Sequence, residues 1–312
     1  MEQNKEKFAK TVKAIGIVSM EKIKGDASER NYFRAIIKKG SSVIIQENLG
    51  ERAYQKAQIK SNEFLEKHLI PVPKMLFLDE KAGIIVFEDI GDLSLFSYLK
   101  NGGKIRKWRR RIEDLLTAFA TLPRKKYRPQ WEPFDRDKYL WELQFFEKKY
   151  LSEETGIRLS RRKKAALSTE YEDIAVFLDR PDKTLIHRDF HSRNIYIFKG
   201  ELRILDHQDL RVGNYFYDRV SFMWDAYVDH GNNREMFMPF LDRDIHYVKV
   251  LALERCLKVL GTFAYLKNEK GKPSYLRFYE KRMLSYLDHL TAFAGYKAIY
   301  DIYQEILEKR WK

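Results

Sequence analysis

Several features are scarce in this chain of 312 residues, and each absence excludes a class of protein. The single cysteine, Cys256, excludes an internal disulfide framework and a zinc site built on cysteines. The most apolar stretches, such as Ile84–Phe87, are far shorter than the roughly 20 residues that a membrane-spanning helix needs. The first residues carry acidic side chains and no long apolar segment, so we expect no signal peptide. These absences predict a cytoplasmic protein.

The sequence does contain enough apolar and aromatic material for a large core. Hydrophobic residues make up 44% of the chain, and 20 Phe, 19 Tyr and 5 Trp are too many for a chain that stays disordered. The length suits one large domain or two moderate ones. We therefore expect a folded protein, most simply one of two lobes.

Positive charge is in excess, with 59 Lys and Arg against 45 Asp and Glu. Two basic runs, 107–111 and 161–164, are candidates for a nucleic-acid site. Apolar residues recur at helical spacing after each run, however, so we place these cations on the solvent-facing sides of amphipathic helices. We predict no nucleic-acid partner, and the positive field favours anionic ligands such as ATP.

The pattern of apolar residues and turns separates a small part with strands from a larger helical part. We expect amphipathic helices over 1–18 and 51–68. Two strand pairs are expected: 32–37 with 42–46, and 74–78 with 83–87. Beyond residue 90 the pattern is helical, apart from one short hairpin. We predict an α+β protein with a small β-rich N-terminal lobe and a larger, mainly helical C-terminal lobe, spanning 1–90 and 91–312.

The hairpin in the helical part carries the chemically informative residues. An apolar approach leads to a polar loop, and two short strands, 195–198 and 202–205, follow around a Lys-Gly-Glu turn. In such a hairpin, Asp206 lies at the same end as Asn194. Asp189 precedes both residues, on the loop. Oxygen ligands of this kind suit Mg²⁺, which one or two carboxylates usually hold together with phosphate oxygens. A further Asp beside the metal can accept the proton of a hydroxyl group.

This spacing is that of the kinase catalytic loop, His-Arg-Asp-x-x-x-x-Asn, followed by a metal-binding Asp. It predicts Asp189 as the base, with Asn194 and Asp206 as ligands of Mg²⁺ on the phosphates of ATP. Other residues are predicted to support the loop rather than to take part in the chemistry: His187, His191 and Asp218.

Two features of protein kinases are missing. Only eleven residues separate Asp206 from Asp218, which leaves no room for an activation segment. The segment Gly25–Arg30 holds one glycine where the kinase glycine loop has three, although Ser28 and nearby amides remain candidates for phosphate contacts. The predicted substrate is therefore a small molecule rather than a peptide.

The sequence resembles the aminoglycoside phosphotransferase/choline kinase superfamily of protein-kinase-like folds. More narrowly, it is similar to the bacterial anomeric sugar kinases that phosphorylate N-acetylmuramate and N-acetylglucosamine in cell-wall recycling. The matching stretches span almost the whole chain: 25–34, 87–92, 187–194, 205–209, 217–221 and 254–264. The resemblance implies a nucleotide-binding N-terminal lobe and a catalytic, substrate-binding C-terminal lobe.

The resemblance also implies where nucleotide and substrate bind. The adenine hinge would comprise Glu88, Asp89 and Ile90. Superfamily kinases usually hold the phosphates with a lysine on the third strand, where this sequence offers Gln46 or Glu47, so Arg30 or Arg34 is left to meet the phosphate charge. The substrate-binding candidates are Gln208, Asp209, Arg193 and Asp225.

We therefore predict an ATP- and Mg²⁺-dependent kinase of a small hydroxylated substrate, an amino sugar such as N-acetylmuramate or N-acetylglucosamine. An aminoglycoside kinase is one alternative, but a polycationic drug needs an acidic cleft. A choline or ethanolamine kinase is another, and would need an aromatic cage. A pseudokinase scaffold is the alternative from a different class, prompted by the missing lysine. We expect no membrane association and no obligate protein partner.

Overall fold

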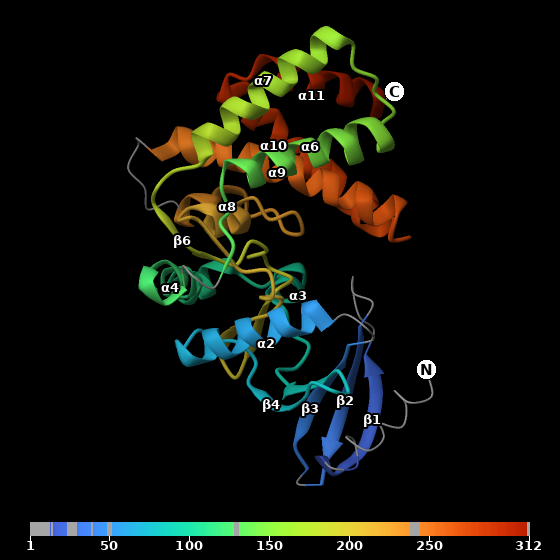
Figure 1. Ribbon diagram of the computed structural model, residues 1–312, viewed down its shortest axis with the longest axis vertical. Coiled ribbons are helices and arrows are strands. Elements are labelled where there is room, and N and C mark those ends of the chain that lie inside the picture. The colour runs from blue at the N-terminus through green and yellow to red at the C-terminus, as the bar shows by residue number, and fades with distance from the viewer. Residues whose placement is uncertain are drawn as a thin grey trace. The chain divides into compact units, whose positions relative to one another are not determined.

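The computed structural model describes residues 13, 15–23, 30–38, 40–48, 52–127, 131–237 and 244–310. The chain divides into two compact units (Figure 1). The first comprises residues 1–98 and 194–210, and the second comprises 99–193 and 211–312. The sequence-based lobes were continuous, whereas here the segment 194–210 belongs with the N-terminal unit. The division falls within the predicted catalytic loop, between Arg193 and Asn194.

The first unit contains a five-stranded antiparallel sheet in the order β1-β2-β3-β5-β4. Its strands are β1 (Ile17–Ile23), β2 (Asn31–Ile37), β3 (Ser42–Glu47), β4 (Met75–Asp79) and β5 (Ile84–Glu88). Both strand pairs expected from the sequence are confirmed. The helix expected over 1–18 is wrong at its end, because Gly16 takes a left-handed φ of 74° and β1 begins at the next residue. The rest of that expected helix, residues 1–12 and 14, lies outside the described residues.

The apolar run of β5 is continuous because both of its faces are buried. Ile84 and Val86 pack with β2 and β3, whereas Ile85 and Phe87 pack with Ile59 of the helix α2 (Arg52–Lys67). Figure 1 shows α2 lying along the sheet. This helix confirms the one expected over 51–68.

A second hairpin completes the first unit. Strands β7 (Ile195–Phe198) and β8 (Glu201–Ile204) pair antiparallel, with Ile195 opposite Ile204. The amide of Ile197 donates to the carbonyl of Leu93, and that of Ile204 donates to Pro71, both at 2.8 Å. These backbone bonds to the chain around the sheet explain why the hairpin belongs with the N-terminal unit.

The second unit is mainly helical, so the predicted α+β class is confirmed. Its longer helices are α4 (Arg109–Ala120), α6 (Arg136–Phe146), α7 (Arg161–Leu178), α9 (Ile245–Asn268), α10 (Ser274–Ala294) and α11 (Lys297–Arg310). Shorter ones are η1 (Ile105–Trp108), α5 (Arg124–Tyr127), η2 (Glu147–Glu154), α8 (Tyr217–Met223) and η3 (Gly231–Phe237), whereas α3 (Leu95–Lys100) spans the boundary and begins in the first unit. Helix α9 is central, and most of its residues are buried in the core of the unit. In the described part of the chain, no helix is long and apolar enough to cross a membrane.

The second unit also holds a two-stranded sheet that the sequence analysis missed. Strand β6 (Lys183–Ile186) pairs antiparallel with β9 (Arg211–Asn214). A Cβ at Gly213 would come too close to Cδ1 of Ile186, so a larger residue at this position would force that side chain to shift. The sequence pattern identified 184–186 only as an apolar approach. Pairing with a segment more than twenty residues away leaves little local signal.

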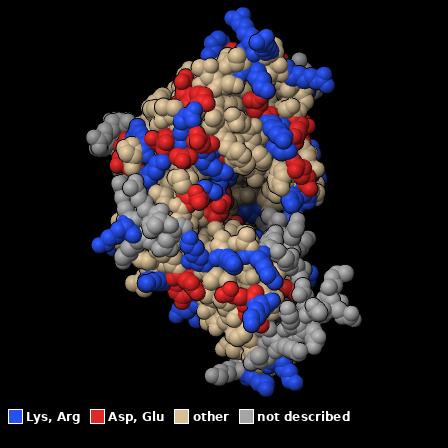
Figure 2. Space-filling view, viewed as in Figure 1, with Lys and Arg blue, Asp and Glu red and all other residues tan. Residues whose placement is uncertain are grey.

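The basic runs lie on helix surfaces, as expected. Arg109, Arg110 and Arg111 are exposed, whereas Ile112 and Phe119 of the same helix are buried. The first four residues of α7 are likewise exposed. Figure 2 shows Lys and Arg interspersed with Asp and Glu over the face drawn, rather than gathered in one uniform patch.

Candidate functional site

The catalytic loop begins where β6 ends and is fastened from α8. The buried Asp218 carboxylate accepts hydrogen bonds from the backbone N–H of His187 at 2.6 Å and of Arg188 at 2.8 Å. Burial raises the pKa of Asp218 to about 6, although these two hydrogen bonds act in the opposite direction. The start of the loop is therefore held by a buried carboxylate.

Arg188 has a left-handed backbone, with a φ of 75°. This conformation costs a non-glycine residue on the order of 1–3 kcal/mol and persists only where the surroundings enforce it. Its guanidinium bonds the buried Glu142 at 2.9 Å, and its carbonyl accepts from Arg255 at 2.9 Å. Together with the hydrogen bond to Asp218, these contacts fix the N–H, the guanidinium and the carbonyl of Arg188. The loop is thereby fixed just before Asp189.

Asp189 is partly exposed, in contrast to the residues that precede it. Its side chain is 36% exposed, and its Oδ1 lies 3.5 Å from Nζ of Lys258 on α9. Burial by itself would raise the pKa of Asp189, but the charges of Lys258, Arg188 and Arg255 outweigh it and hold the pKa well below its usual range. Asp189 is thus an ionised carboxylate at neutral pH, able to accept a hydrogen bond from a hydroxyl group.

The end of the loop is anchored by Asp225. This residue has no solvent exposure, and its two oxygens accept from the backbone N–H groups of Ser192 and Tyr227, both at 2.7 Å. A carboxylate used in this way positions the loop. Both oxygens of Asp225 are engaged by backbone amides, and its predicted contact with the substrate stays a prediction.

The other loop residues make ring contacts within the second unit. His187 packs edge-on against Phe119 and Phe190, with centroids 6.1 and 6.3 Å away. His191 lies edge-on to Tyr227 at 4.8 Å. The Arg193 guanidinium lies over the rings of Tyr227 and Tyr275, at 4.8 and 5.5 Å.

In the first unit, the hairpin brings Asn194 and Asp206 to the same end. The amide of Leu205 donates to the carbonyl of Asn194 at 2.8 Å, one step beyond the last paired residues of β7 and β8. Asp206 is exposed and has a left-handed φ of 64°. The side-chain amide of Gln208 donates to Asp206 at 2.9 Å, and Asp209 is exposed.

The donor types at this end of the hairpin fit Mg²⁺. One amide oxygen and one carboxylate are hard ligands, which suit Mg²⁺ rather than zinc. Across the described residues, no group of three or more His, Cys, Asp or Glu side chains forms a metal cage. A metal here would take its remaining ligands from phosphate oxygens and water, as Mg²⁺ commonly does.

Arg34 is committed to two carboxylates that follow β5. Its Nε lies 2.7 Å from Asp89 Oδ2, and its Nη2 lies 2.8 Å from Asp92 Oδ1. Asp89 also accepts from Ser42 Oγ at 2.5 Å and from the N–H of Gly91 at 2.9 Å. The side chains of Arg34 and Asp89 therefore fasten β2 and β3 to the hinge segment. The predicted role of Arg34 at the phosphates stays a prediction, and in this structure its guanidinium is engaged by these two carboxylates.

The other two residues of the predicted hinge, Glu88 and Ile90, also have side chains that contact the first unit. Glu88 accepts from the N–H of Lys74 at 3.1 Å and lies 3.7 Å from Arg203. Ile90 is buried in the first unit. An adenine ring at this segment would therefore contact the backbone rather than these side chains.

The expected lysine position is occupied by a neutral amide pair. Gln46 is buried, and its amide exchanges hydrogen bonds with that of Gln58 on α2, at 2.5 and 2.8 Å. The neighbouring Glu47 instead accepts from Asn31 at 2.8 Å. Of the two candidates left open by the sequence, Gln46 is therefore the one that faces the helix. Gln58 was missed, because a single glutamine on a helix carries no signal of its partner.

Arg30 and Asp206 both act on the hydroxyl of Tyr54. Its guanidinium carbon sits 3.9 Å from the ring centroid of Tyr54. Burial and then the charge of Asp206 raise the pKa of Tyr54 far above its usual range, while Arg30 opposes this. Within the described residues, no carboxylate forms an ion pair with Arg30. Ser28, the other phosphate candidate of this segment, lies outside those residues.

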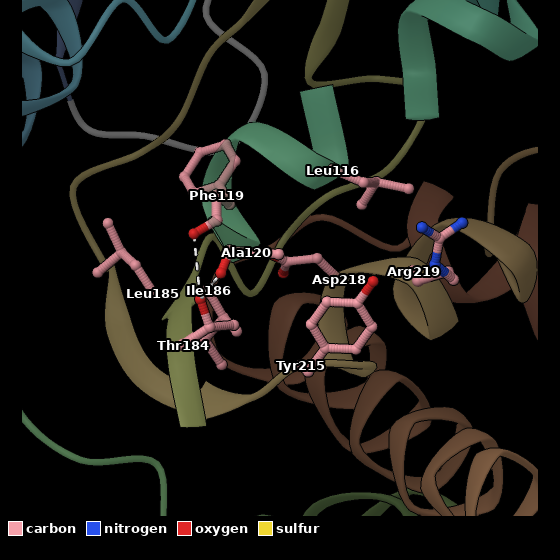
Figure 3. Close-up of a pocket in the computed structure, with 9 residues that line it drawn as sticks. All are labelled: Leu116, Phe119, Ala120, Thr184, Leu185, Ile186, Tyr215, Asp218 and Arg219. Carbon is pink, nitrogen blue, oxygen red and sulfur yellow. Dashed lines mark hydrogen bonds between the residues drawn. The ribbon is translucent and has the colours of Figure 1, made fainter. Parts of the chain in front are cut away.

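A small hollow behind the catalytic loop lies between α4, β6 and α8 (Figure 3). Its lining is mostly apolar: Leu116, Phe119, Ala120, Thr184, Leu185, Ile186, Tyr215, Asp218 and Arg219. The Thr184 hydroxyl lies 3.0 Å from the carbonyl of Phe119 and 3.2 Å from that of Ala120. The hollow contains Asp218 but neither the base nor the predicted substrate ligands, so we assign it to packing.

A β-sheet unit, an Asp on a loop and an Asn–Asp pair on a hairpin are the parts that kinase-type phosphotransferases use. The model of the phosphotransferase enzyme family matches residues 19–243, and the chain belongs to this family. The predicted family and enzyme class are thereby confirmed.

Curated relatives share most of their length with this chain. The N-acetylmuramate/N-acetylglucosamine kinase of Neisseria meningitidis serogroup B is 26% identical over 285 residues, which cover 85% of this chain and 84% of the relative. The kinase of the same name from Pseudomonas aeruginosa is 24% identical over 269 residues, with coverage of 80% and 78%.

Solved structures share the fold at low identity. The GDP complex of wild-type aminoglycoside 2'-phosphotransferase-IIIa has a TM-score of 0.65 at 14% identity, covering 90% of this chain and 99% of that one. Choline kinase LicA from Streptococcus pneumoniae has a TM-score of 0.59 at 16% identity, covering 94% and 100%. The predicted protein-kinase-like fold is confirmed.

Proposed function

We propose that the protein is an ATP- and Mg²⁺-dependent kinase that phosphorylates a hydroxyl group of an N-acetyl amino sugar, N-acetylmuramate or N-acetylglucosamine. The observation that carries the proposal is the ionised Asp189 on a loop held from both ends by buried carboxylates. The substrate class rests on the curated relatives, which match most of the chain. We also propose a cytoplasmic location, where ATP is available.

In this mechanism Asp189 accepts a hydrogen bond from the substrate hydroxyl and orients its oxygen toward the γ-phosphorus. As the new O–P bond forms, the bond to the bridging oxygen of ADP breaks, and its electron pair leaves with ADP. The hydroxyl proton passes to Asp189. Because its pKa is held low, Asp189 is a weak base, and its main contribution is orientation.

Asn194 and Asp206 would hold Mg²⁺, which neutralises charge on the phosphates when bound. The backbone of residues 88–91 would accept the adenine ring. Of the two arginines considered for the phosphates, Arg30 is the one we retain, because Arg34 is paired with Asp89 and Asp92. Its stacking on Tyr54 supports this role by limiting its conformational freedom.

On the acceptor side, Gln208, Asp209 and Arg193 remain the proposed contacts for sugar hydroxyls. Asp225, the fourth predicted contact, also supports the loop, together with His187, His191 and Asp218.

The residues around the base disfavour two rival substrates, a polycationic aminoglycoside and choline. Lys258, Arg188 and Arg255 all act on Asp189, which is unfavourable for a polycationic aminoglycoside. A choline kinase needs aromatic rings that receive a quaternary ammonium group. Tyr227 and Tyr275 beside the loop are instead covered by the guanidinium of Arg193.

A substrate panel tests the proposal. ADP release with Mg²⁺ and ATP would be measured with N-acetylmuramate, N-acetylglucosamine, unmodified hexoses, choline and kanamycin. We expect turnover with an N-acetyl amino sugar and at most background with choline and kanamycin. Preferred turnover of kanamycin or choline would contradict the substrate class, and binding of ATP without turnover of any acceptor would favour the scaffold alternative.

A further inference from the structure

Lys258 stands beside the proposed base, and no role described above uses it. It lies on α9, its side chain is only 13% exposed, and its Nζ is 3.5 Å from Asp189 Oδ1. Lysine is rarely withdrawn from solvent in this way unless it is paired. A cation in this position requires a partner or a function.

The two arginines near Asp189 donate hydrogen bonds to other residues of the second unit. Arg188 bonds Glu142 at 2.9 Å. Arg255 donates to the carbonyl of Arg188, to the hydroxyl of Tyr217 at 2.6 Å and to that of Ser221 at 2.8 Å. Their charges act on Asp189, but their donors face the core of the second unit.

Lys258 differs from these arginines in its contacts. In the part of the chain that the structure describes, Asp189 is the one carboxylate within ion-pair distance of its ammonium group. The separation of 3.5 Å is at the long limit of a hydrogen bond, so the pair is loose. An ammonium group carries three donors, and this contact engages only one of them.

The charges that act on the base would also attract an anion beside it. Lys258, Arg188 and Arg255 are the cations that hold the pKa of Asp189 low. An anionic group that binds next to Asp189 is attracted by the same three charges.

The reaction places an anion at this point. In a reactive complex the hydroxyl oxygen lies within hydrogen-bond distance of the base, and the phosphorus lies about 3–3.5 Å beyond that oxygen. A flexible ammonium group that already touches the base can reach an oxygen of the transferred group. Charge on those oxygens is what a phosphotransferase stabilises in the transition state.

We propose that Lys258 is a catalytic residue that binds the transferred phosphoryl group, donating from its ammonium to a phosphoryl oxygen while it remains beside Asp189. Lys258 transfers no proton in this step, because the hydroxyl proton goes to Asp189 and the electron pair of the broken bond goes to ADP. The inference rests on the proposed kinase function, which it deepens.

An anionic oxygen of a different origin is the competing ligand. N-acetylmuramate carries a carboxylate, and N-acetylglucosamine carries none. A lysine that binds the acceptor carboxylate would matter only for the first sugar, whereas a lysine that binds the phosphoryl group matters equally for both.

The test compares Lys258→Met and Lys258→Arg with the wild type on both sugars, recording kcat and the KM for ATP. Lys267→Met is the matched control, because Lys267 lies on the same helix and pairs with Glu154 at 2.7 Å. Nine residues of helix place it about 13 Å further along the axis. Thermal unfolding of each variant shows whether it is folded.

We expect Lys258→Met to lower kcat by about 100-fold or more on both sugars, as removal of one transition-state donor does. The KM for ATP should change less than about threefold, since a transition-state contact leaves ground-state binding intact. Lys258→Arg should recover part of the rate. Lys267→Met should retain the wild-type kcat.

Three outcomes would overturn the inference. A loss confined to N-acetylmuramate would assign Lys258 to the acceptor carboxylate. An unchanged kcat, or an equal loss in Lys267→Met, would leave it a structural residue. If the wild type phosphorylates neither sugar, the proposed substrate fails separately. Lys258 is then tested on the hydrolysis of ATP by water. Lys258→Met should slow this hydrolysis by a similar factor, and an unchanged rate would contradict the inference.

Discussion

The Asp218 carboxylate accepts a hydrogen bond of 2.8 Å from the N–H of Arg188, whose backbone is left-handed at a φ of 75°. The bond links a helix start to the residue immediately before the proposed base. Replacing Asp218 with Asn puts an amide donor against a backbone donor. We expect a loss of about 1–3 kcal/mol in the free energy of unfolding and a reduced kcat. Urea unfolding and steady-state kinetics measure the two effects, and a fully active, fully stable variant would contradict the supporting role.

The same carboxylate predicts a pH dependence of stability. Burial raises the folded-state pKa of Asp218 from 3.8 to about 6, so folding disfavours its ionised form. Its contribution to stability is therefore fully present below the unfolded pKa and is lost as the pH rises through 6. The stability of the wild type relative to Asp218→Asn should fall between pH 4 and pH 7, by roughly 3 kcal/mol at most. Urea unfolding of both proteins at each pH measures this difference, and a difference that grows with pH would contradict it.

Substitutions of Arg30 and Arg34 should differ in their effects on thermal stability and on the KM for ATP. Arg34→Met breaks the pairs with Asp89 and Asp92, so it should lower the melting temperature and change the KM for ATP little. Arg30→Met leaves those pairs in place and should raise the KM for ATP several-fold if Arg30 meets the phosphates. Kinetics and thermal unfolding of the two variants, measured side by side, decide the matter. The reverse assignment of effects would restore Arg34 as the phosphate ligand.

The hydrogen-bonded pair Gln46–Gln58 can be replaced by a pair of oppositely charged residues. Gln46→Lys alone should destabilise the protein, because it buries an ammonium group opposite a neutral amide. Adding Gln58→Glu supplies the partner and should recover much of the loss. A double-mutant cycle of unfolding free energies measures the coupling. Additive losses would show that the two side chains do not interact.

Local patterns allowed much of this structure to be predicted, and long-range partners account for the rest. The alternating apolar residues of β2 and β3, the buried run of β5 and the spacing of Asp189, Asn194 and Asp206 are all contained in short segments. The pairing of β6 with β9 joins segments that are distant in the sequence, and local patterns did not reveal it.

Two charged residues show the same limit of local patterns. Arg34 is paired with carboxylates more than fifty residues away, and Asp225 binds a loop amide more than thirty residues before it. Without its partner, a charged residue in the sequence suggests a ligand contact. The structure adds the partner, and with it a structural role for each of these two side chains.

The most direct test of the account compares Asp189→Asn with Asp206→Ala, in kinase turnover on the preferred N-acetyl sugar and in calorimetric binding of ATP with Mg²⁺. Asp189→Asn should abolish turnover while the nucleotide still binds with nearly wild-type affinity, because Asp189 acts on the hydroxyl. Asp206→Ala should weaken the binding of the metal–nucleotide complex itself. Near-wild-type turnover in both variants would contradict the account, since neither the proposed base nor the proposed metal ligand would then be needed for phosphoryl transfer.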